Sequence, residues 1–224
     1  MMPWMHVIDI GHTAVMVPTA GAIAVWLMSG RAWKLAACWC LIFAAGLGLV
    51  ALSKIAFLGW GLQWPSLGFK ALSGHAWRTA AVLPVLFFVF LQGAPDTWRK
   101  RGFALGVMLS IGLGVLLIVF RFHTTSEVLA SLVLGVAAGR VFVCLSATLP
   151  VPGANPQALP MSLLAFFIIC SLKPSAINHR LVDVALYFSG RDHPYRWTRD
   201  VDVCAARKHG PLHGTSKVDL RRPC

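Results

Sequence analysis

The chain has 224 residues, of which 57% are hydrophobic and only 12% charged, and its mean hydropathy is +0.70. Soluble domains carry about 25% charged residues, so this balance excludes an ordinary soluble domain and indicates a protein that uses lipid as its solvent. The formal charge of +12 does not indicate a nucleic-acid partner. Half of the lysines and arginines fall in residues 173–224, and most of the others lie in short connections between apolar runs.

Apolar runs long enough to cross a bilayer follow one another along the chain. We expect spans near residues 13–29, 35–53, 76–95, 102–120 and 128–149, while a shorter run at 158–172 spans, re-enters or lies in the interface. The sequence therefore predicts an all-α integral membrane bundle of five to six transmembrane helices in residues 1–172. Residues 173–224 form a basic C-terminal tail, with an amphipathic stretch near 181–188 and an end that we expect to be partly disordered.

Some residues in these runs suggest how the helices pack. Trp60, Trp64 and Trp77 fit an aromatic belt at the membrane interface. Cys38-Trp39-Cys40 lacks the spacing of a zinc or redox motif, so we expect no metal and no cofactor. Small residues one helical turn apart predict close contact between helices; they are Gly106, Ser110, Gly114, Gly135 and Gly139.

The charges in the connections predict an orientation. Arg31 and Lys34 lie in the first connection, residues 99–101 are all basic in the third, and Arg140 lies towards the far end of the fifth span. The positive-inside rule makes their shared face cytoplasmic. The second connection, residues 54–75, and the fourth, residues 121–127, then share the extracytoplasmic face.

Those two connections contain the candidate site. The first 172 residues hold three acids, and the chain's one glutamate, Glu127, follows His123 by one helical turn at the mouth of a span. Ionisable groups at such positions are functional candidates. Ser73, Gly74 and His75 stand at the mouth of another span, and positive charge comes from two further positions, Lys54 and Arg121.

This inventory suits a phosphate group. Lys54 and Arg121 neutralise its oxygens, and the amides at the start of the helix after Ser73 favour an anion. Because Glu127 can orient the ring of His123 and stabilise its imidazolium, we assign His123 as the nucleophile. His75 has no carboxylate nearby and is assigned as the general acid.

Each residue also has a plainer structural interpretation. Thr124-x-x-Glu127 is a capping box that starts a helix whatever its function, and Ser73 is a good N-cap. Lys54 and Arg121 could be interfacial anchors that extend towards the headgroups. The coincidence of both histidine sites on one face favours the catalytic interpretation.

The residues resemble the type 2 phosphatidic acid phosphatase (PAP2) superfamily over roughly residues 13–149. That family has the motifs Lys-x6-Arg-Pro, Pro-Ser-Gly-His and Ser-Arg-x5-His-x3-Asp. Here the second is Leu72-Ser73-Gly74-His75, and the third runs from His123 to Glu127, with glutamate in place of aspartate. The first keeps Lys54, but Gly61 stands at its arginine position, as in a bacterial branch of the family. Leu117 stands where the third motif has its arginine.

The resemblance implies a PAP2/haloperoxidase-like helical core and metal-independent hydrolysis through a phosphohistidine. By the motif match His123 is the nucleophile, Glu127 orients it and His75 is the general acid, while Lys54, Ser73 and Gly74 bind phosphate. Arg121, two residues before His123, and Arg78, one turn after His75, are the candidates to replace the missing arginines.

We therefore expect a membrane phosphatase acting on a lipid phosphate or diphosphate, such as phosphatidic acid, phosphatidylglycerophosphate or polyprenyl diphosphate. Its location would be a bacterial inner membrane, with the site on the extracytoplasmic face. The sequence leaves open a non-catalytic relative that binds or moves an anionic lipid, and a small proton-coupled transporter. It gives no oligomeric state.

Overall fold

The computed structural model describes residues 13–149, 155, 157–171, 177–191 and 193–195. These residues form helices and no strand, which confirms the predicted all-α fold, and the backbones of Trp64 and Phe69 meet in one isolated bridge. The helices are α2 (Thr13–Ser29), α3 (Trp33–Trp60), the short 3-10 helix η1 (Pro65–Leu67), α4 (Gly74–Phe90), α5 (Asp96–Val119), α6 (Thr125–Thr148), α7 (Ala158–Ser171) and α8 (Ile177–Ser189).

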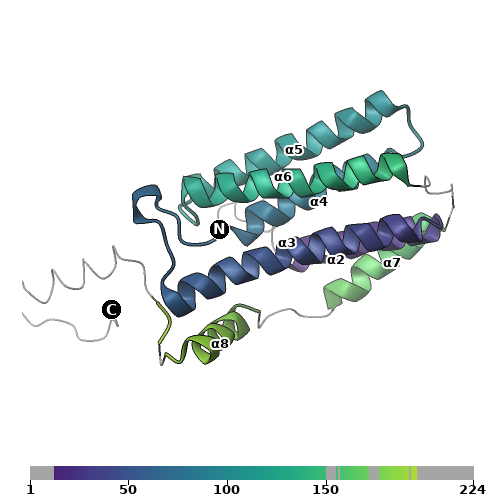
Figure 1. Cartoon of the computed structure of the whole chain (residues 1–224). Coiled ribbons are helices and arrows are strands. Elements are labelled where there is room, and N and C mark those ends of the chain that lie inside the picture. The colour runs from purple at the N-terminus through teal and green to yellow at the C-terminus, as the bar shows by residue number, and fades with distance from the viewer. Residues whose placement is uncertain (1–12, 150–154, 156, 172–176, 192, 196–224) are drawn as a thin grey trace, which may run out of the picture.

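Three of these helices, α3, α5 and α6, are long and apolar enough to cross a membrane. Helices α2, α4 and α7 are equally apolar but shorter. All six run side by side along one axis in Figure 1. The chain is thus an all-helical protein with the character of a membrane protein, and its apolar outer surface agrees with that environment.

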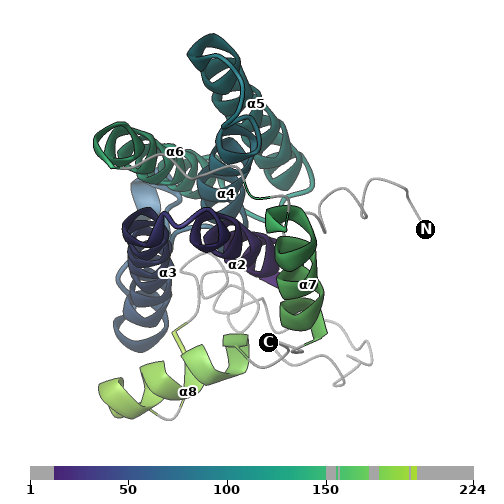
Figure 2. The same cartoon turned by 90° about the vertical axis from the view of Figure 1, so that its right-hand side faces the viewer.

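Helix α4 occupies the centre of the bundle, with α2, α3, α5 and α6 around it (Figure 2). Its side chains are accordingly buried on almost every face. Trp77 is 1% exposed and its ring packs against Phe43 of α3, with ring centroids 5.4 Å apart. A Cβ at Gly46 would lie 1.8 Å from that ring, so the absent side chain makes the space for it. The prediction of an interfacial Trp77 is therefore wrong, whereas Trp60 and Trp64 are exposed.

The small residues of α5 and α6 bring these helices against α4, as predicted. A Cβ added at Gly106 would lie 2.5 Å from the backbone of Pro84, and one at Gly135 would lie 2.7 Å from the carbonyl oxygen of Trp77. The hydroxyl of Ser110 lies 2.9 Å from the carbonyl oxygen of Thr79, to which it donates. Such contacts replace the hydrophobic drive that is missing between helices in lipid.

Two helices extend further than the apolar runs indicated. Helix α3 continues to Trp60, so Lys54 lies within a helix and not in a connection; Gly61 then ends it with a left-handed φ of 68°. Helix α5 begins at Asp96, where an ion pair of 2.7 Å to Lys100 stabilises the exposed first turns. Lysine and arginine are good helix formers. The charged residues therefore interrupt the apolar pattern of the sequence but not the helix.

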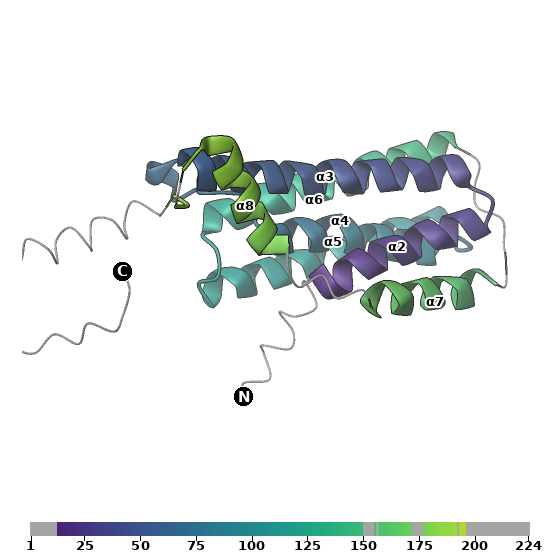
Figure 3. The ribbon, with the colours of Figure 1, turned by 90° about the horizontal axis from the view of Figure 1, so that it is seen from below.

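Helix α7 lies along α2 in the opposite direction. The side-chain amide of Asn155, before α7, donates to the carbonyl of Ser29 at the end of α2, and the thiol of Cys170 lies 3.5 Å from the carbonyl oxygen of Ala14 at its start. Helix α7 therefore returns the chain towards the end of the bundle where α3 stops and α4 starts. There α8 crosses α3 at a steep angle and is seen lengthwise in the end-on view (Figures 2 and 3).

The glycine contacts in α5 give a matched pair of variants. We expect Gly106→Ala to lower the stability by about 1–3 kcal/mol, because the new methyl group meets the rigid backbone at Pro84. Gly112→Ala in the same helix has no atom within 4 Å and should be neutral or slightly stabilising. Thermal unfolding midpoints in detergent measure both. Equal midpoints for the two variants would contradict the close α4–α5 contact.

Candidate functional site

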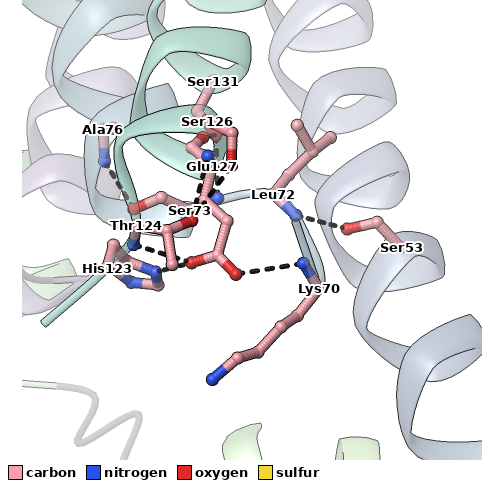
Figure 4. A network of polar contacts seen from close by, with 10 residues as sticks. All are labelled: Ser53, Lys70, Leu72, Ser73, Ala76, His123, Thr124, Ser126, Glu127 and Ser131. Atoms are coloured by element: carbon pink, nitrogen blue, oxygen red, sulfur yellow. Dashed lines mark hydrogen bonds and ion pairs between the residues drawn. The ribbon is translucent and has the colours of Figure 1, made fainter. Parts of the chain in front are cut away.

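Glu127 connects three parts of the chain (Figure 4). Its Oε2 lies 2.9 Å from Nδ1 of His123 and accepts the backbone N–H of Thr124 at 3.3 Å, while Oε1 accepts the backbone N–H of Lys70 at 3.1 Å. The hydroxyl of Thr124 in turn accepts the backbone N–H of Glu127, which completes the capping box. The capping box predicted at Thr124 and Glu127 is therefore confirmed, and the same carboxylate contacts the ring of His123.

Hydroxyl groups fix the start of α4 to α6 and α3. The backbone N–H of Ser73 donates to Oγ of Ser131 at 2.8 Å, and that hydroxyl donates to the carbonyl of Glu127 at 2.6 Å. The backbone N–H of Leu72 donates to Oγ of Ser53 at 3.1 Å. Ser73 is also the N-cap of α4, because its side chain accepts the N–H of Ala76. The Ser-Gly-His segment and the His123 segment thus lie at the same end of the bundle, as the charge count predicted.

A cavity of about 350 Å³ opens beside this network. It combines the imidazole of His123 and the carboxylate of Glu127 with the cations Lys54 and Lys70 and with apolar side chains. Its lining comes from α3, the connection before α4, the start of α6 and the tail helix α8: Lys54, Phe57, Leu58, Lys70, Ala71, Leu72, Phe122, His123, Glu127, Leu181 and Val182. The cavity offers a binding place for a group that is anionic at one side and apolar at the other.

Arg78 lies inside the bundle near the start of α4 and is not among the cavity-lining residues. It is 8% exposed, and a Cβ at Gly74 would lie 3.0 Å from its Nη1, so the glycine allows the guanidinium to approach the start of α4. The charge of Arg78 interacts with that of Lys54. Among the described residues the two ion pairs are Lys100–Asp96 and His123–Glu127, and Nε of Arg78 has no hydrogen-bond partner there. A buried guanidinium is costly unless it is paired or hydrogen-bonded, so Arg78 is a candidate to bind an anion.

Arg121 lies instead on the exposed turn between α5 and α6. Its φ of 58° is left-handed, its N–H donates to the carbonyl of Ile118, and that of Phe122 donates to Leu117. These two bonds form a Schellman motif, in which the left-handed residue is usually glycine. The turn places His123 beside Glu127, and Arg121 is not among the residues that line the cavity.

His75 is the second residue of α4 and is half-buried, and its carbonyl accepts the hydroxyl of Thr79. It is close in sequence to Ser73 and Gly74 but is not one of the cavity-lining residues. The sequence analysis missed Lys70, Ser131 and the tail residues at the cavity. The sequence does contain a signal for Lys70, because it is an isolated cation three residues before Ser73. It contains none for Ser131, because a serine within an apolar span is commonplace.

Comparisons with known proteins give one informative relative. The chain is 32% identical over 152 residues to a Klebsiella pneumoniae protein described as an uncharacterized 22.5 kDa protein in the cps region; the match covers 67% of this chain and 73% of that protein. No family model matches the chain. No solved structure matches it either.

The hydroxyl that joins α4 to α6 is open to a stability test. Ser131→Ala leaves the buried N–H of Ser73 without its acceptor, so we expect a loss of about 1–3 kcal/mol in unfolding free energy. Ser146→Ala, in the same helix, removes only a bond to its own helix and should change stability little. Unfolding of both variants in detergent measures the difference. A Ser131→Ala protein as stable as Ser146→Ala would contradict the role of this bond.

Proposed function

We propose that this protein is a metal-independent membrane phosphatase of the PAP2 type. The chain belongs to the family of the Klebsiella pneumoniae 22.5 kDa protein. Its substrate would be a lipid phosphate or diphosphate. The observation that carries the proposal is the 2.9 Å contact of Glu127 with Nδ1 of His123 on the wall of a cavity that also contains lysines.

This contact suits His123 to be the nucleophile. A carboxylate on Nδ1 favours the tautomer with the proton on Nδ1, so the lone pair is on Nε2. Nε2 then attacks phosphorus, and the imidazolium that develops is stabilised by Glu127. The backbone N–H of Lys70 and that of Thr124 hold the carboxylate in place, so the geometry is set before substrate binds.

The reaction has two steps. In the first, the Nε2–P bond forms, the bond from phosphorus to the leaving oxygen breaks, and His75 gives its proton to that oxygen. In the second, His75 takes a proton from water, the water oxygen attacks the phosphohistidine, and the P–N bond breaks to release inorganic phosphate from a diphosphate or a monoester. Entry of substrate would bring His75 of α4 to the leaving oxygen.

Cations around the cavity support binding of the phosphoryl oxygens. Lys54 and Lys70 line it, Arg78 lies buried behind Gly74, and Glu127 is the one carboxylate among the lining residues. We assign Arg78 as the replacement for the missing motif arginine, because its guanidinium is buried at the N-terminus of α4 without an ion pair among the described residues. The amide of Gly74 would add a donor there.

The proposed setting is a bacterial inner membrane with six crossings. The antiparallel run of α7 along α2 supports the sixth, since it returns the tail to the end of the bundle that holds His123. The basic first and third connections, with Arg31 and Arg99, support a cytoplasmic position for the other end. A substrate headgroup at the interface would reach the cavity without leaving the bilayer.

Phosphate release tests the activity. Purified protein in mixed micelles with a panel of lipid phosphates and diphosphates, in the presence of EDTA, should release inorganic phosphate. His123→Ala should abolish release, and Glu127→Gln should lower kcat by about 10²–10⁴-fold because the tautomer is no longer fixed. Lys34→Ala, at the opposite end of the bundle, is the matched control and should retain full activity.

The same assay separates the two arginines. Arg78→Ala should lower kcat/KM by about 30- to 1000-fold, because it removes one hydrogen-bond donor to the transition state. Arg121→Ala should have little effect. If wild type releases nothing from any substrate, or if His123→Ala releases as much as wild type, the phosphatase proposal is wrong. Binding of anionic lipid without release would then favour a non-catalytic relative.

Labelling of single cysteines tests the orientation. Cysteine at Leu67 or Asp183, both exposed, should react with a membrane-impermeant maleimide in intact spheroplasts, while cysteine at Lys34 should react only after permeabilisation. The unsubstituted protein gives the background from native cysteines. Labelling of Asp183→Cys together with Lys34→Cys, and not with Leu67→Cys, would rule out the sixth crossing.

A further inference from the structure

Helix α8 of the tail packs on the last turns of α3. Ala185 of α8 is fully buried, and a Cβ at Gly59 would lie 3.1 Å from its carbonyl oxygen, so the glycine allows α8 to pack closely. Leu181 and Val182 of the same helix line the cavity beside His123. Helix α8 therefore contributes one wall of the candidate site.

Beyond α8 the chain continues onto the C-terminal end of α3. The backbone N–H of Tyr195 donates to the carbonyl of Leu58 at 2.8 Å, and its ring meets that of Phe57 edge-on, with centroids 6.5 Å apart. The same ring covers Gly61: a Cβ there would lie 2.6 Å from ring atoms. The guanidinium carbon of Arg191 lies 5.1 Å from the centre of the Tyr195 ring.

Gly61 is the position at which the first motif of the resembling family has its arginine. A side chain there and the Tyr195 ring exclude each other, because both need the space above Gly61. The chain thus has, at one place, a missing arginine, an aromatic ring that occupies the vacant space, and an arginine stacked on that ring. Stacking uses the face of the guanidinium and leaves its N–H edge available for an oxyanion.

The geometry relates this arginine to the cavity. Gly61 follows Lys54 by seven residues, which on a helix is nearly two turns, so both positions lie on the same face about 10 Å apart along the axis. Lys54 lines the cavity. Tyr195 contacts Phe57 and Leu58, which both line the cavity, so the Arg191 stacked on its ring lies close to the cavity without being one of its lining residues.

We propose that Arg191, held by Tyr195 over Gly61, is a substrate-binding residue at the rim and that it adapts the site to a diphosphate on an apolar chain. This inference rests on the proposed function. With Arg191 at the rim and Arg78 behind Gly74, the site would have four cations, two of them, Lys54 and Lys70, in the cavity lining, against the carboxylate of Glu127; the net charge would then be +3 with the histidines neutral.

That charge matches a diphosphate ester better than a monoester. A terminal phosphate carries nearly two charges near pH 7 and an inner one carries one, so a diphosphate ester has a charge of about −3 and a phosphate monoester about −2. The reacting terminal phosphate would lie against His123 and Lys54, and the inner phosphate would meet Arg191. The apolar side chains of Phe57, Leu181 and other lining residues would contact the first part of the chain.

Kinetics on a matched pair of substrates test this assignment. With farnesyl diphosphate, Arg191→Ala should lower kcat/KM by about 10- to 100-fold, the loss of one charged hydrogen-bonding partner. With farnesyl monophosphate the same variant should stay within about threefold of wild type, because the inner phosphate is missing. Arg191→Lys should recover part of the loss, and Tyr195→Ala should reproduce it. Arg180→Ala, on the exposed surface of α8, is the control for charge and should leave both substrates unaffected.

A binding measurement separates this inference from the activity itself. Calorimetry of the full chain with inorganic pyrophosphate and with inorganic phosphate should show that Arg191→Ala weakens pyrophosphate binding about tenfold or more and hardly changes phosphate binding. If wild type hydrolyses neither farnesyl substrate but this difference is found, the proposed function fails and the rim site stands. The rim site is wrong if Arg191→Ala has as little effect as Arg180→Ala, or if it lowers kcat/KM or affinity equally for the diphosphate and the monophosphate. This holds whatever the activity of wild type.

Discussion

The arrangement of this end of the bundle depends on the hydrogen bonds of one carboxylate. Glu127 accepts from the connection before α4 through Lys70, from its own helix start through Thr124, and contacts the ring of His123. Glu127 is 4% exposed, and a carboxylate is costly to bury unless such donors surround it. These partners belong to two segments, the connection before α4 and the turn before α6, so the carboxylate fixes those two segments relative to each other.

The sequence predicted the helices and the pairing of the two histidine segments well, and for physical reasons. Apolar runs separated by charged connections are the strongest signal that a sequence contains, and the alternation of those charges places residues 54–75 and 121–127 at the same end. The bonds from Lys70 to Glu127 and from Ser73 to Ser131 show this proximity directly. Close packing at Gly106 and Gly135 followed from small-residue spacing.

What the sequence did not predict depends on contacts between residues far apart in the chain. The burial of Trp77 needs the missing side chain of Gly46, and the docking of Tyr195 needs that of Gly61, 134 positions earlier. Neither pair has a periodic or local signature. The direction of Arg78 was also open, because one turn into a helix an arginine can extend outwards or turn back; the contact with Gly74 shows that it turns back.

The double task of Glu127 gives a physical reason for the departure from the aspartate of the resembling motif. A capping box needs a side chain at the third helical position that reaches back to the N–H of the N-cap residue, and glutamate has the necessary length. Here the reach to Thr124 and the contact with His123 come from the same oxygen, Oε2, while Oε1 is left for Lys70. An aspartate, shorter by one methylene, could not keep the three bonds with the backbone where it is. The longer side chain of glutamate therefore explains the additional bond to the backbone of Lys70. It lets one carboxylate cap the start of α6, contact the ring of His123 and hold the segment that leads into α4.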